Sequence, residues 1–258
     1  MMQVDDLPKT PSFRLDGRRA IVTGAGRGIG LGVATAFAEA GAHVSLCART
    51  ASEIESAAEA MRSRGWSAEA LVCDVTDIEV FEKAIAAHEP YDILFNNAGT
   101  NRPKPFVDVP PEDFDVIMGL NVRAAFFVAQ TVVRKLIAAG KPGTIINVSS
   151  QMGHVGGAGR SVYCASKWAV EGFSRAMAIE LGAQGIRVNT ICPTFIETPM
   201  TRPYLSDPAF MESVLSKIKL GRLGAVSDIM GAAVFLASDA SAMMTGTSLL
   251  VDGGWTAE

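Results

Sequence analysis

Tyr163 and Lys167 lie four residues apart in a segment with helical periodicity, so a helix would place both side chains on one face, one turn apart. A phenol ordinarily titrates near a pKa of about 10, and a neighbouring ammonium lowers that pKa by favouring the phenolate. The pair therefore indicates acid-base chemistry at a phenolic oxygen. The same spacing is common on solvated helix faces, so the pair alone does not define an active site.

Two serines, Ser149 and Ser150, follow the apolar stretch Ile145-Ile146-Asn147-Val148, which is typical of a buried strand. Ligands of open α/β sheets bind at the carboxyl ends of the strands. A hydroxyl at that edge can polarise a substrate carbonyl, or it can simply cap the loop that follows. Together with Tyr163 and Lys167, a serine there makes up a set suited to moving a proton at a substrate oxygen.

A glycine-rich turn, Thr23-Gly24-Ala25-Gly26-Arg27-Gly28-Ile29-Gly30, joins the first expected strand to the first expected helix. Its glycines allow a tight bend and let backbone N–H groups approach a pyrophosphate at the positive end of the helix. An ordinary tight turn is the alternative. The position of this turn in the first βαβ unit favours a dinucleotide site.

The residue type at the end of the second expected strand bears on the choice of dinucleotide. NAD-binding folds commonly place an acidic residue there, about 20 positions beyond the glycine turn, whereas this chain has Ala48-Arg49. Glu53 fits a helix capping box with Thr50, so we do not assign it to a ribose. Arg49 and Arg27 are suited to a 2'-phosphate. We predict a preference for NADP(H), with NAD(H) as the alternative and two ordinary surface arginines as the simpler reading.

Strand-like and helix-like segments alternate along most of the chain. Strands are expected at 19–23, 43–48, 69–73, 92–95, 144–148, 187–191 and 247–251, and helices at 29–40, 52–64, 78–88, 111–139, 161–181, 208–217 and 227–237. This pattern predicts an α/β fold, a single-domain Rossmann-type doubly wound sheet of about seven parallel strands with helices on both faces. A (β/α)8 barrel would need one more unit.

The composition fits a globular protein with a large core. Of 258 residues, 48% are hydrophobic and 19% charged, and 23 basic against 27 acidic residues give a net charge of -4. This balance excludes disordered and collagen-like classes. We expect no nucleic-acid or membrane partner, because like charges form no block and no run of 18 apolar residues occurs. Residues 15–258 are expected to form one domain, after a flexible arm at 1–14 that lacks the features of a secretory signal.

Four cysteines, Cys47, Cys73, Cys164 and Cys192, lie far apart in apolar stretches. No Cys-x-x-Cys pair or companion histidine accompanies them, so we expect reduced packing residues, no metal and a cytoplasmic location.

From about residue 17 to residue 257, the chain resembles the short-chain dehydrogenase/reductase family. The matching motifs are residues 23–30, Asp74-Val75, Asn96-Asn97-Ala98-Gly99, Asn121, Ser150, Tyr163-Cys164-Ala165-Ser166-Lys167 and Val251-Asp252-Gly253-Gly254. The resemblance implies an oxidoreductase that transfers a hydride between NADP(H) and a carbonyl or secondary alcohol.

The resemblance also implies catalytic roles. Tyr163 would be the general acid in reduction and the base in oxidation, with Ser150 hydrogen-bonded to the substrate oxygen. Lys167 would bind the nicotinamide ribose and lower the pKa of the tyrosine. Asn121 would hold a water in a proton relay behind Lys167.

Further residues would hold the cofactor. By resemblance, Gly24, Arg27, Gly28, Ile29 and Gly30 would surround the phosphates, as the glycine turn already suggests. Asp74 and Val75 would contact the adenine, Asn97, Ala98 and Gly99 would line the adenosine ribose, and Ile196 and Thr198 would hold the nicotinamide carboxamide. One departure is Pro193-Thr194, where the family often has Pro-Gly; the threonine restricts the backbone and adds a side chain near the nicotinamide.

The substrate is less constrained by the sequence. A segment at about 195–220 interrupts the strand-helix alternation and is expected to close over the substrate, although its aromatic and Met residues also suit local packing. Gln151, His154, Arg160 and Arg102 are candidates to approach the site, and two cations there would favour an acidic or polyhydroxylated substrate. The pattern is most similar to the gluconate 5-dehydrogenase and 3-oxoacyl-[acyl-carrier-protein] reductase branch, which suggests a sugar acid, a polyol or a 3-oxoacyl compound.

The same residues are also compatible with other functions. The chain is alternatively an NAD-dependent sugar or polyol dehydrogenase, or a non-catalytic dinucleotide-binding regulator on the same fold. A sugar epimerase is disfavoured because those relatives tend to be longer. The resemblance implies a homotetramer, for which Ala124, Ala125, Phe126, Phe127 and Ala129, together with small residues at 165–178, offer apolar faces. These residues would equally suit packing on their own sheet.

Overall fold

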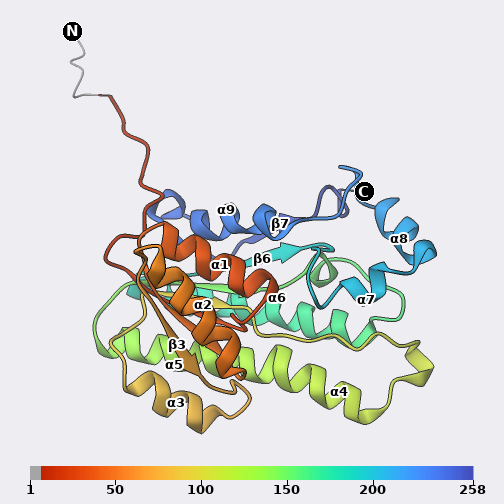
Figure 1. Cartoon of the computed structure of the whole chain (residues 1–258), viewed down its shortest axis with the longest axis horizontal. Coiled ribbons are helices and arrows are strands. Elements are labelled where there is room, and N and C mark those ends of the chain that lie inside the picture. The colour runs from red at the N-terminus through yellow and green to blue at the C-terminus, as the bar shows by residue number, and fades with distance from the viewer. Residues whose placement is uncertain (1–6, 258) are drawn as a thin grey trace.

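The computed structural model describes residues 7–257, which form one seven-stranded sheet flanked by helices (Figure 1). The strands are β1 (Arg19–Thr23), β2 (His43–Ala48), β3 (Ala68–Val72), β4 (Ile93–Asn96), β5 (Gly143–Val148), β6 (Ile186–Pro193) and β7 (Ser248–Val251). All neighbours are parallel, in the order β3-β2-β1-β4-β5-β6-β7. The predicted doubly wound α/β sheet of about seven parallel strands is confirmed.

The helices alternate with the strands as the periodicity predicts. They are α1 (Gly28–Glu39), α2 (Ala51–Ser63), α3 (Ile78–Ala86), α4 (Pro111–Met118), α5 (Ala125–Ala138), α6 (Ser161–Leu181), α7 (Arg202–Leu205), α8 (Pro208–Leu215) and α9 (Val226–Ala237). Most bounds agree with the predicted ones to within one or two residues. The four-residue helix α7 was not predicted, because it is too short to show a periodicity.

Both faces of the sheet are covered by apolar helix faces. On one face, Phe37 of α1 and Ile229 of α9 pack on strand residues such as Val22. On the other face, Phe81 of α3 and Val128 of α5 belong to a second core with Ile145. Since parallel strands buried on both faces carry apolar residues at successive positions, these strands read as continuous apolar runs.

The strand order runs outward from the centre in both directions: β2 and β3 follow β1 on one side, and β4 to β7 follow on the other. The switch point lies between β1 and β4, which are neighbours in the sheet. A crevice forms outside the carboxyl ends of the strands at such a switch point. Thr23 secures the crevice, because its hydroxyl accepts hydrogen bonds from the backbone N–H groups of Asn97 at 2.9 Å and Ala98 at 3.1 Å. The loop after β4 is thereby fixed to the glycine turn after β1.

The predicted helix at 111–139 is interrupted. A π-helical turn, Gly119–Ala124, separates α4 from α5. By length and by a mean hydropathy of 1.6, the helical run Pro111–Ala138 is long and apolar enough to cross a membrane. In the folded chain its apolar residues have a different explanation, since Val128, Val132 and Leu136 are buried against the sheet.

The expected flexible arm at 1–14 falls partly outside the described residues, which begin at Leu7. Phe13 lies 6.1 Å from the ring of Phe235, and Arg14 donates hydrogen bonds to Asp16 and to the carbonyl of Glu39. The end of this segment therefore packs on the domain.

The segment at 195–220 contains α7 and α8 and has a small apolar cluster of its own. Phe195, Leu205, Val214 and Ile218 are buried together with Met152. Phe195 also stacks on Trp255 near the end of the chain, with ring centres 5.7 Å apart. The segment is thus anchored over the carboxyl edge of the sheet.

Candidate active site

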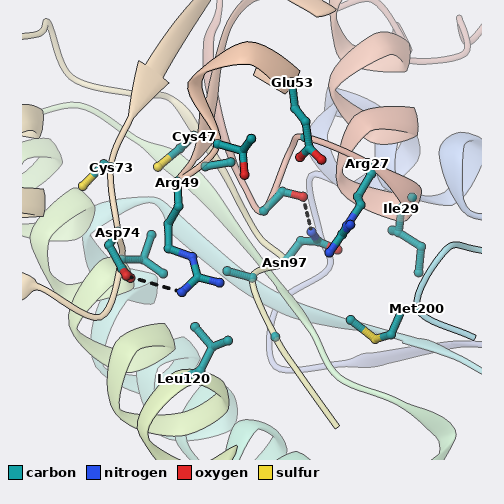
Figure 2. A pocket seen from close by; sticks show the side chains of 18 of the residues that line it. Arg27, Ile29, Cys47, Arg49, Glu53, Cys73, Asp74, Asn97, Leu120 and Met200 are labelled. Atoms are coloured by element: carbon teal, nitrogen blue, oxygen red, sulfur yellow. Dashed lines mark hydrogen bonds and ion pairs between the residues drawn. The ribbon is translucent and has the colours of Figure 1, made fainter. Parts of the chain in front are cut away.

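Three adjoining hollows follow the carboxyl ends of the strands, and Met200 lines all of them. The first lies over the glycine turn and the ends of β2, β3 and β4 (Figure 2). The third contains Ser150, Tyr163 and Lys167, and the second opens from it on the side of Arg160. The predicted cofactor residues Gly24, Arg27, Gly28, Ile29, Arg49, Asp74, Val75, Asn97, Ala98, Gly99 and Thr198 line the first hollow, and Ile196 lines the third.

The glycine turn leaves room for the close approach of a phosphate. Gly24 and Gly28 have φ of +65° and +58°, which L-residues with side chains rarely adopt. A Cβ on Gly30 would lie 2.3 Å from the carbonyl oxygen of Gly24, so this position packs helix against turn rather than lining the hollow. With the N-terminus of α1 directly behind it, the turn fits a dinucleotide pyrophosphate.

Charged side chains surround the far end of the first hollow. The guanidinium of Arg49 lies 3.6 Å from a carboxylate oxygen of Asp74, and a dashed line in Figure 2 marks this ion pair. Hydrogen bonds from Thr76 together with Arg49 hold the pKa of Asp74 below its ordinary value despite some burial. Arg27 and Arg49 both remain exposed toward solvent.

The capping box predicted at Thr50 and Glu53 is wrong. Within residues 7–257, the Thr50 side chain makes no capping hydrogen bond at the start of α2. Glu53 instead lines the first hollow, and its carboxylate lies so close to Gly26 that a Cβ there would come within 2.4 Å of it. The Glu53 carboxylate therefore lies against the glycine turn and not at a helix cap.

Helix α6 presents Tyr163 and Lys167 to the third hollow on one face, as predicted. The Lys167 ammonium lies 5.5 Å from the centre of the tyrosine ring and donates a 2.8 Å hydrogen bond to the carbonyl of Val148. Burial lowers the pKa of Lys167 to about 8, partly opposed by Cys192 and Glu171. Burial raises the pKa of Tyr163, and the Ser150 hydroxyl and the charge of Arg160 offset only part of this rise.

This result differs from the expectation that the ammonium lowers the phenol pKa. Desolvation of the phenolate outweighs the hydrogen bond of Ser150 and the positive charge of Arg160. A protonated tyrosine is the form that can give a proton to a carbonyl oxygen.

Ser150 caps the loop that follows β5, and it also lies where its hydroxyl can reach a ligand. Its hydroxyl accepts a hydrogen bond from the backbone N–H of Met152, capping the short 3-10 turn Gln151–Gly153, and donates to the Gln151 side chain at 2.7 Å. It also lines both hollows that meet at Tyr163. The hydroxyl is therefore held in place before any substrate arrives.

Asn121 lies in the π-helical turn between α4 and α5, outside the residues that line the hollows. Its amide accepts a hydrogen bond from the N–H of Thr100 and donates to the carbonyl of Thr100 and to the Ser166 hydroxyl. π-helical turns often mark functional positions. This turn places Asn121 between the loop after β4 and the helix that carries Tyr163 and Lys167.

Thr194 shows the effect of the departure from Pro-Gly. None of the described residues other than glycine has a positive φ, so the backbone at Thr194 needs no glycine. Its side chain lines the second and third hollows, and its buried hydroxyl has no hydrogen-bond partner within residues 7–257. Thr194 therefore adds an unsatisfied polar group to the wall of the site.

The second hollow brings together some of the residues suggested for substrate contact. Gln151 and Arg160 line it, as do Phe195, Met200 and Tyr204 from the segment at 195–220. Phe210 packs in the apolar cluster of that segment instead. The segment thus lines the second hollow and also forms packing contacts of its own.

Two other candidates lie away from the hollow. Arg102 is bound to Asp113 at 2.8 Å. His154 lies beside Glu171 and Cys192, 3.4 Å from the cysteine sulfur. The sequence allows for two cations at the substrate site. Of the cationic candidates, Arg160 lines the second hollow, whereas Arg102 and His154 do not.

The second hollow has further lining residues that the sequence did not predict. Asn101, Met152 and Thr201 also line the second hollow. Asn101 and Thr201 come from loops after β4 and β6, the strand ends where ligands are expected. That signal points to the loops and does not identify their individual side chains.

Comparison with known proteins places this site in a family context. A family model described as enoyl-(acyl carrier protein) reductase matches residues 24–256. A D-erythrulose reductase from Gallus gallus is 42% identical over 245 residues, covering 95% of this chain and 98% of that protein. A gluconate 5-dehydrogenase from Gluconobacter oxydans is 40% identical over 248 residues, covering 95% and 96%.

The structure is similar to solved ones over almost the same extent. A gluconate 5-dehydrogenase from Burkholderia cenocepacia in complex with NADP and tartrate superimposes with a TM-score of 0.92 at 38% identity, covering 95% of this chain and 98% of the other. The fold of this chain is therefore shared with solved structures along almost its whole length.

Proposed function

The chain belongs to the short-chain dehydrogenase/reductase family, and from this premise we propose that it is an NADP(H)-dependent oxidoreductase acting on the carbonyl or secondary alcohol of a small polyhydroxylated substrate. The observation that carries the proposal is the convergence of Ser150, Tyr163 and Lys167 on one hollow that adjoins the glycine turn. A sheet edge with these three side chains is suited to hydride transfer coupled to proton transfer.

The cofactor assignment is supported by charge. Arg49 and Arg27 line the first hollow, and a guanidinium binds a phosphate through two parallel hydrogen bonds. Several solved relatives of this chain hold NADP, including the gluconate 5-dehydrogenase from Burkholderia cenocepacia. When bound, NADP(H) supplies or accepts the hydride.

Side chains of the protein carry out the proton transfer. Tyr163 is protonated at neutral pH already at the ordinary phenol pKa of about 10, and burial raises that pKa further. It donates its proton to the substrate oxygen during reduction and takes it back during oxidation. Ser150 holds the same oxygen by a hydrogen bond, for which its hydroxyl turns away from Gln151. Lys167 places a positive charge beside the ring, which stabilises the phenolate left after the transfer.

Steady-state assays test the proposal. NADPH and NADH are each combined with keto acids, ketoses and 3-oxoacyl thioesters, and the absorbance of the reduced cofactor is followed. We expect turnover with NADPH and at least one carbonyl class. Tight binding of NADPH without turnover of any class would instead favour the non-catalytic regulator.

We also propose a homotetrameric assembly in the cytoplasm. Ala124 and Ala129 pack in the core on the sheet and Ala125 is buried, whereas Phe126 on α5 and Trp168 on α6 are exposed, the latter at 56%. Phe126 contacts Phe173 of α6 with ring centres 5.8 Å apart, so the two helices share one apolar surface. Contact of this surface with a second copy would cover it. Light scattering tests the assembly, and a strict monomer at working concentration contradicts it.

A further inference from the structure

Arg160 is a buried cation at the substrate side of the site. It precedes α6, three residues before Tyr163, and is only 8% exposed. It lines the second hollow together with Ser150 and Tyr163, the two residues that hold the reacting oxygen. A ligand that fills this hollow therefore contacts both the proton donor and a guanidinium.

No anion balances this charge within residues 7–257. The Arg160 side chain makes neither an ion pair nor a hydrogen bond there, and its neighbours are the rings of Phe195, Tyr204 and Phe210, at 5.5, 5.5 and 5.8 Å from the guanidinium carbon. Aromatic rings recover part of the cost of desolvating a cation. They do not replace the hydrogen bonds that the N–H groups of a guanidinium lose when it leaves water.

Neighbouring cations behave differently. Arg102 and Lys104, on the loop after β4, both bind Asp113, at 2.8 and 2.7 Å. The lack of a carboxylate partner at Arg160 is thus a local property of the hollow. Within the described part of the chain, neither the second nor the third hollow has an acidic lining residue, and Lys167 adds a second positive charge.

Two more polar atoms in the same wall lack partners. The side-chain oxygens of Asn101 and Thr194 are buried without a hydrogen bond to any described residue. Both residues line the second hollow. Buried polar atoms without partners are rare, and a binding site uses a few polar groups of its lining to orient its ligand. An amide oxygen and a hydroxyl suit the hydroxyl groups of a sugar.

We propose that Arg160 binds a carboxylate of the substrate, so that the enzyme acts on a sugar acid in preference to the neutral sugar of the same length. Asn101 and Thr194 bind its hydroxyl groups, while Ser150 and Tyr163 hold the oxygen that is reduced or oxidised. This inference rests on the proposed oxidoreductase function and narrows its substrate class.

Matched substrates isolate the carboxylate. 5-Keto-D-gluconate and L-sorbose share their carbon chain and carbonyl, and differ in a carboxylate against a hydroxymethyl group; 2-keto-D-gluconate and D-fructose form a second such pair. With NADPH, we expect at least one acid to exceed its neutral partner in kcat/KM by about 100-fold, as for a buried charge pair. The neutral diketone 2,3-butanedione reports on hydride transfer without a carboxylate.

Variants assign the preference to the guanidinium. Arg160→Met should reduce the acid-to-ketose ratio of kcat/KM by about 100-fold, mainly through KM. Arg160→Lys keeps the charge and should retain part of the acid-to-ketose preference in kcat/KM. Because it is a conservative change, it also controls for loss of folding. Arg102→Gln should leave the ratio unchanged, because Arg102 is bound to Asp113 outside the hollow.

A binding measurement complements turnover. D-Gluconate should raise the Tm of the NADP+-bound enzyme and D-glucitol should not, with the shift lost in Arg160→Met. Equal kcat/KM for acids and ketoses would overturn the role of Arg160, and so would an equal loss of kcat/KM for both in Arg160→Met. In either case, reduction of 2,3-butanedione would still support the oxidoreductase function. Absence of turnover with every compound would contradict the oxidoreductase function, and the Tm shifts would still decide whether Arg160 binds a carboxylate.

Discussion

The guanidinium of Arg49 lies 3.6 Å from the carboxylate of Asp74, across the ends of β2 and β3. The cation that we assign to the 2'-phosphate is therefore already oriented by an acidic neighbour, at the edge of the first hollow. Both side chains are accessible to solvent, so this ion pair contributes little to stability. Its value lies in orienting the guanidinium at the edge of the hollow that the glycine turn also lines.

Replacement of Arg49 tests this cofactor assignment. Arg49→Ala should lower kcat/KM for NADPH by about 10- to 100-fold, because a hydrogen bond to a charged group is lost. The value for NADH should change by less than about threefold. Arg64→Ala, at the end of α2 where Arg64 contacts Trp66, is the matched control. A preference for NADH that survives Arg49→Ala would contradict the assignment.

Two glycine-to-alanine substitutions should have opposite effects. A Cβ on Gly30 would collide with the backbone of Gly24, so Gly30→Ala should displace the turn and weaken NADPH binding by about 1–3 kcal/mol. At Gly231, on α9, a Cβ would meet nothing within 4 Å. Gly231→Ala should therefore stabilise the protein by about 1 kcal/mol without affecting the cofactor. Fluorescence titration and urea unfolding measure both effects, and equal NADPH affinity in the two variants would refute the role of Gly30.

The pKa of Lys167 makes stability depend on pH. Because this pKa is about 8 in the folded protein and 10.5 ordinarily, the unfolded chain holds more protons between these values. The contribution of Lys167 to the free energy of unfolding should therefore rise with pH across this window, by about 3 kcal/mol relative to Lys167→Met. Urea unfolding at pH 7.5, 9 and 10 measures the difference. A constant difference between the two proteins would show that Lys167 is not desolvated.

Replacement of Thr194 should change the stability of the protein and its affinity for substrate in opposite directions. Its buried hydroxyl lacks a partner among residues 7–257, so Thr194→Val should stabilise the ligand-free protein by about 1 kcal/mol and raise KM for the substrate. Thr144 is the matched contrast, since its hydroxyl donates to the carbonyl of Leu236. Thr144→Val should destabilise the protein by about 1 kcal/mol. Destabilisation by both changes would mean that Thr194 has a partner after all.

Much of the fold was predictable because it follows from periodicity. Apolar runs such as Ile145 and Ile146 in β5 are typical of strands buried on both faces, and they mark a parallel sheet. Tyr163 and Lys167 were predictable for a related reason, since a helix fixes which residues share a face. Their joint position beside Ser150 follows from the sheet edge at which β5 ends.

The rest depends on contacts between distant segments. Thr50 and Glu53 match a capping box, but the carboxylate packs on Gly26, a residue from another turn. Arg160 is an isolated charge in a glycine-rich loop, and only the folded chain shows aromatic rings around it and no described carboxylate beside it. Sequence periodicity does not report such long-range neighbours.

The proton donated by Tyr163 is the centre of this account, and single-turnover reduction with Tyr163→Phe tests it most directly. NADPH is bound first, its Kd is measured by fluorescence, and the carbonyl substrate is then added. The account predicts a loss of hydride transfer of about 100- to 10,000-fold, with a Kd for NADPH within about threefold of the original. Hydride transfer within tenfold of the unaltered enzyme, at an unchanged Kd, would contradict it.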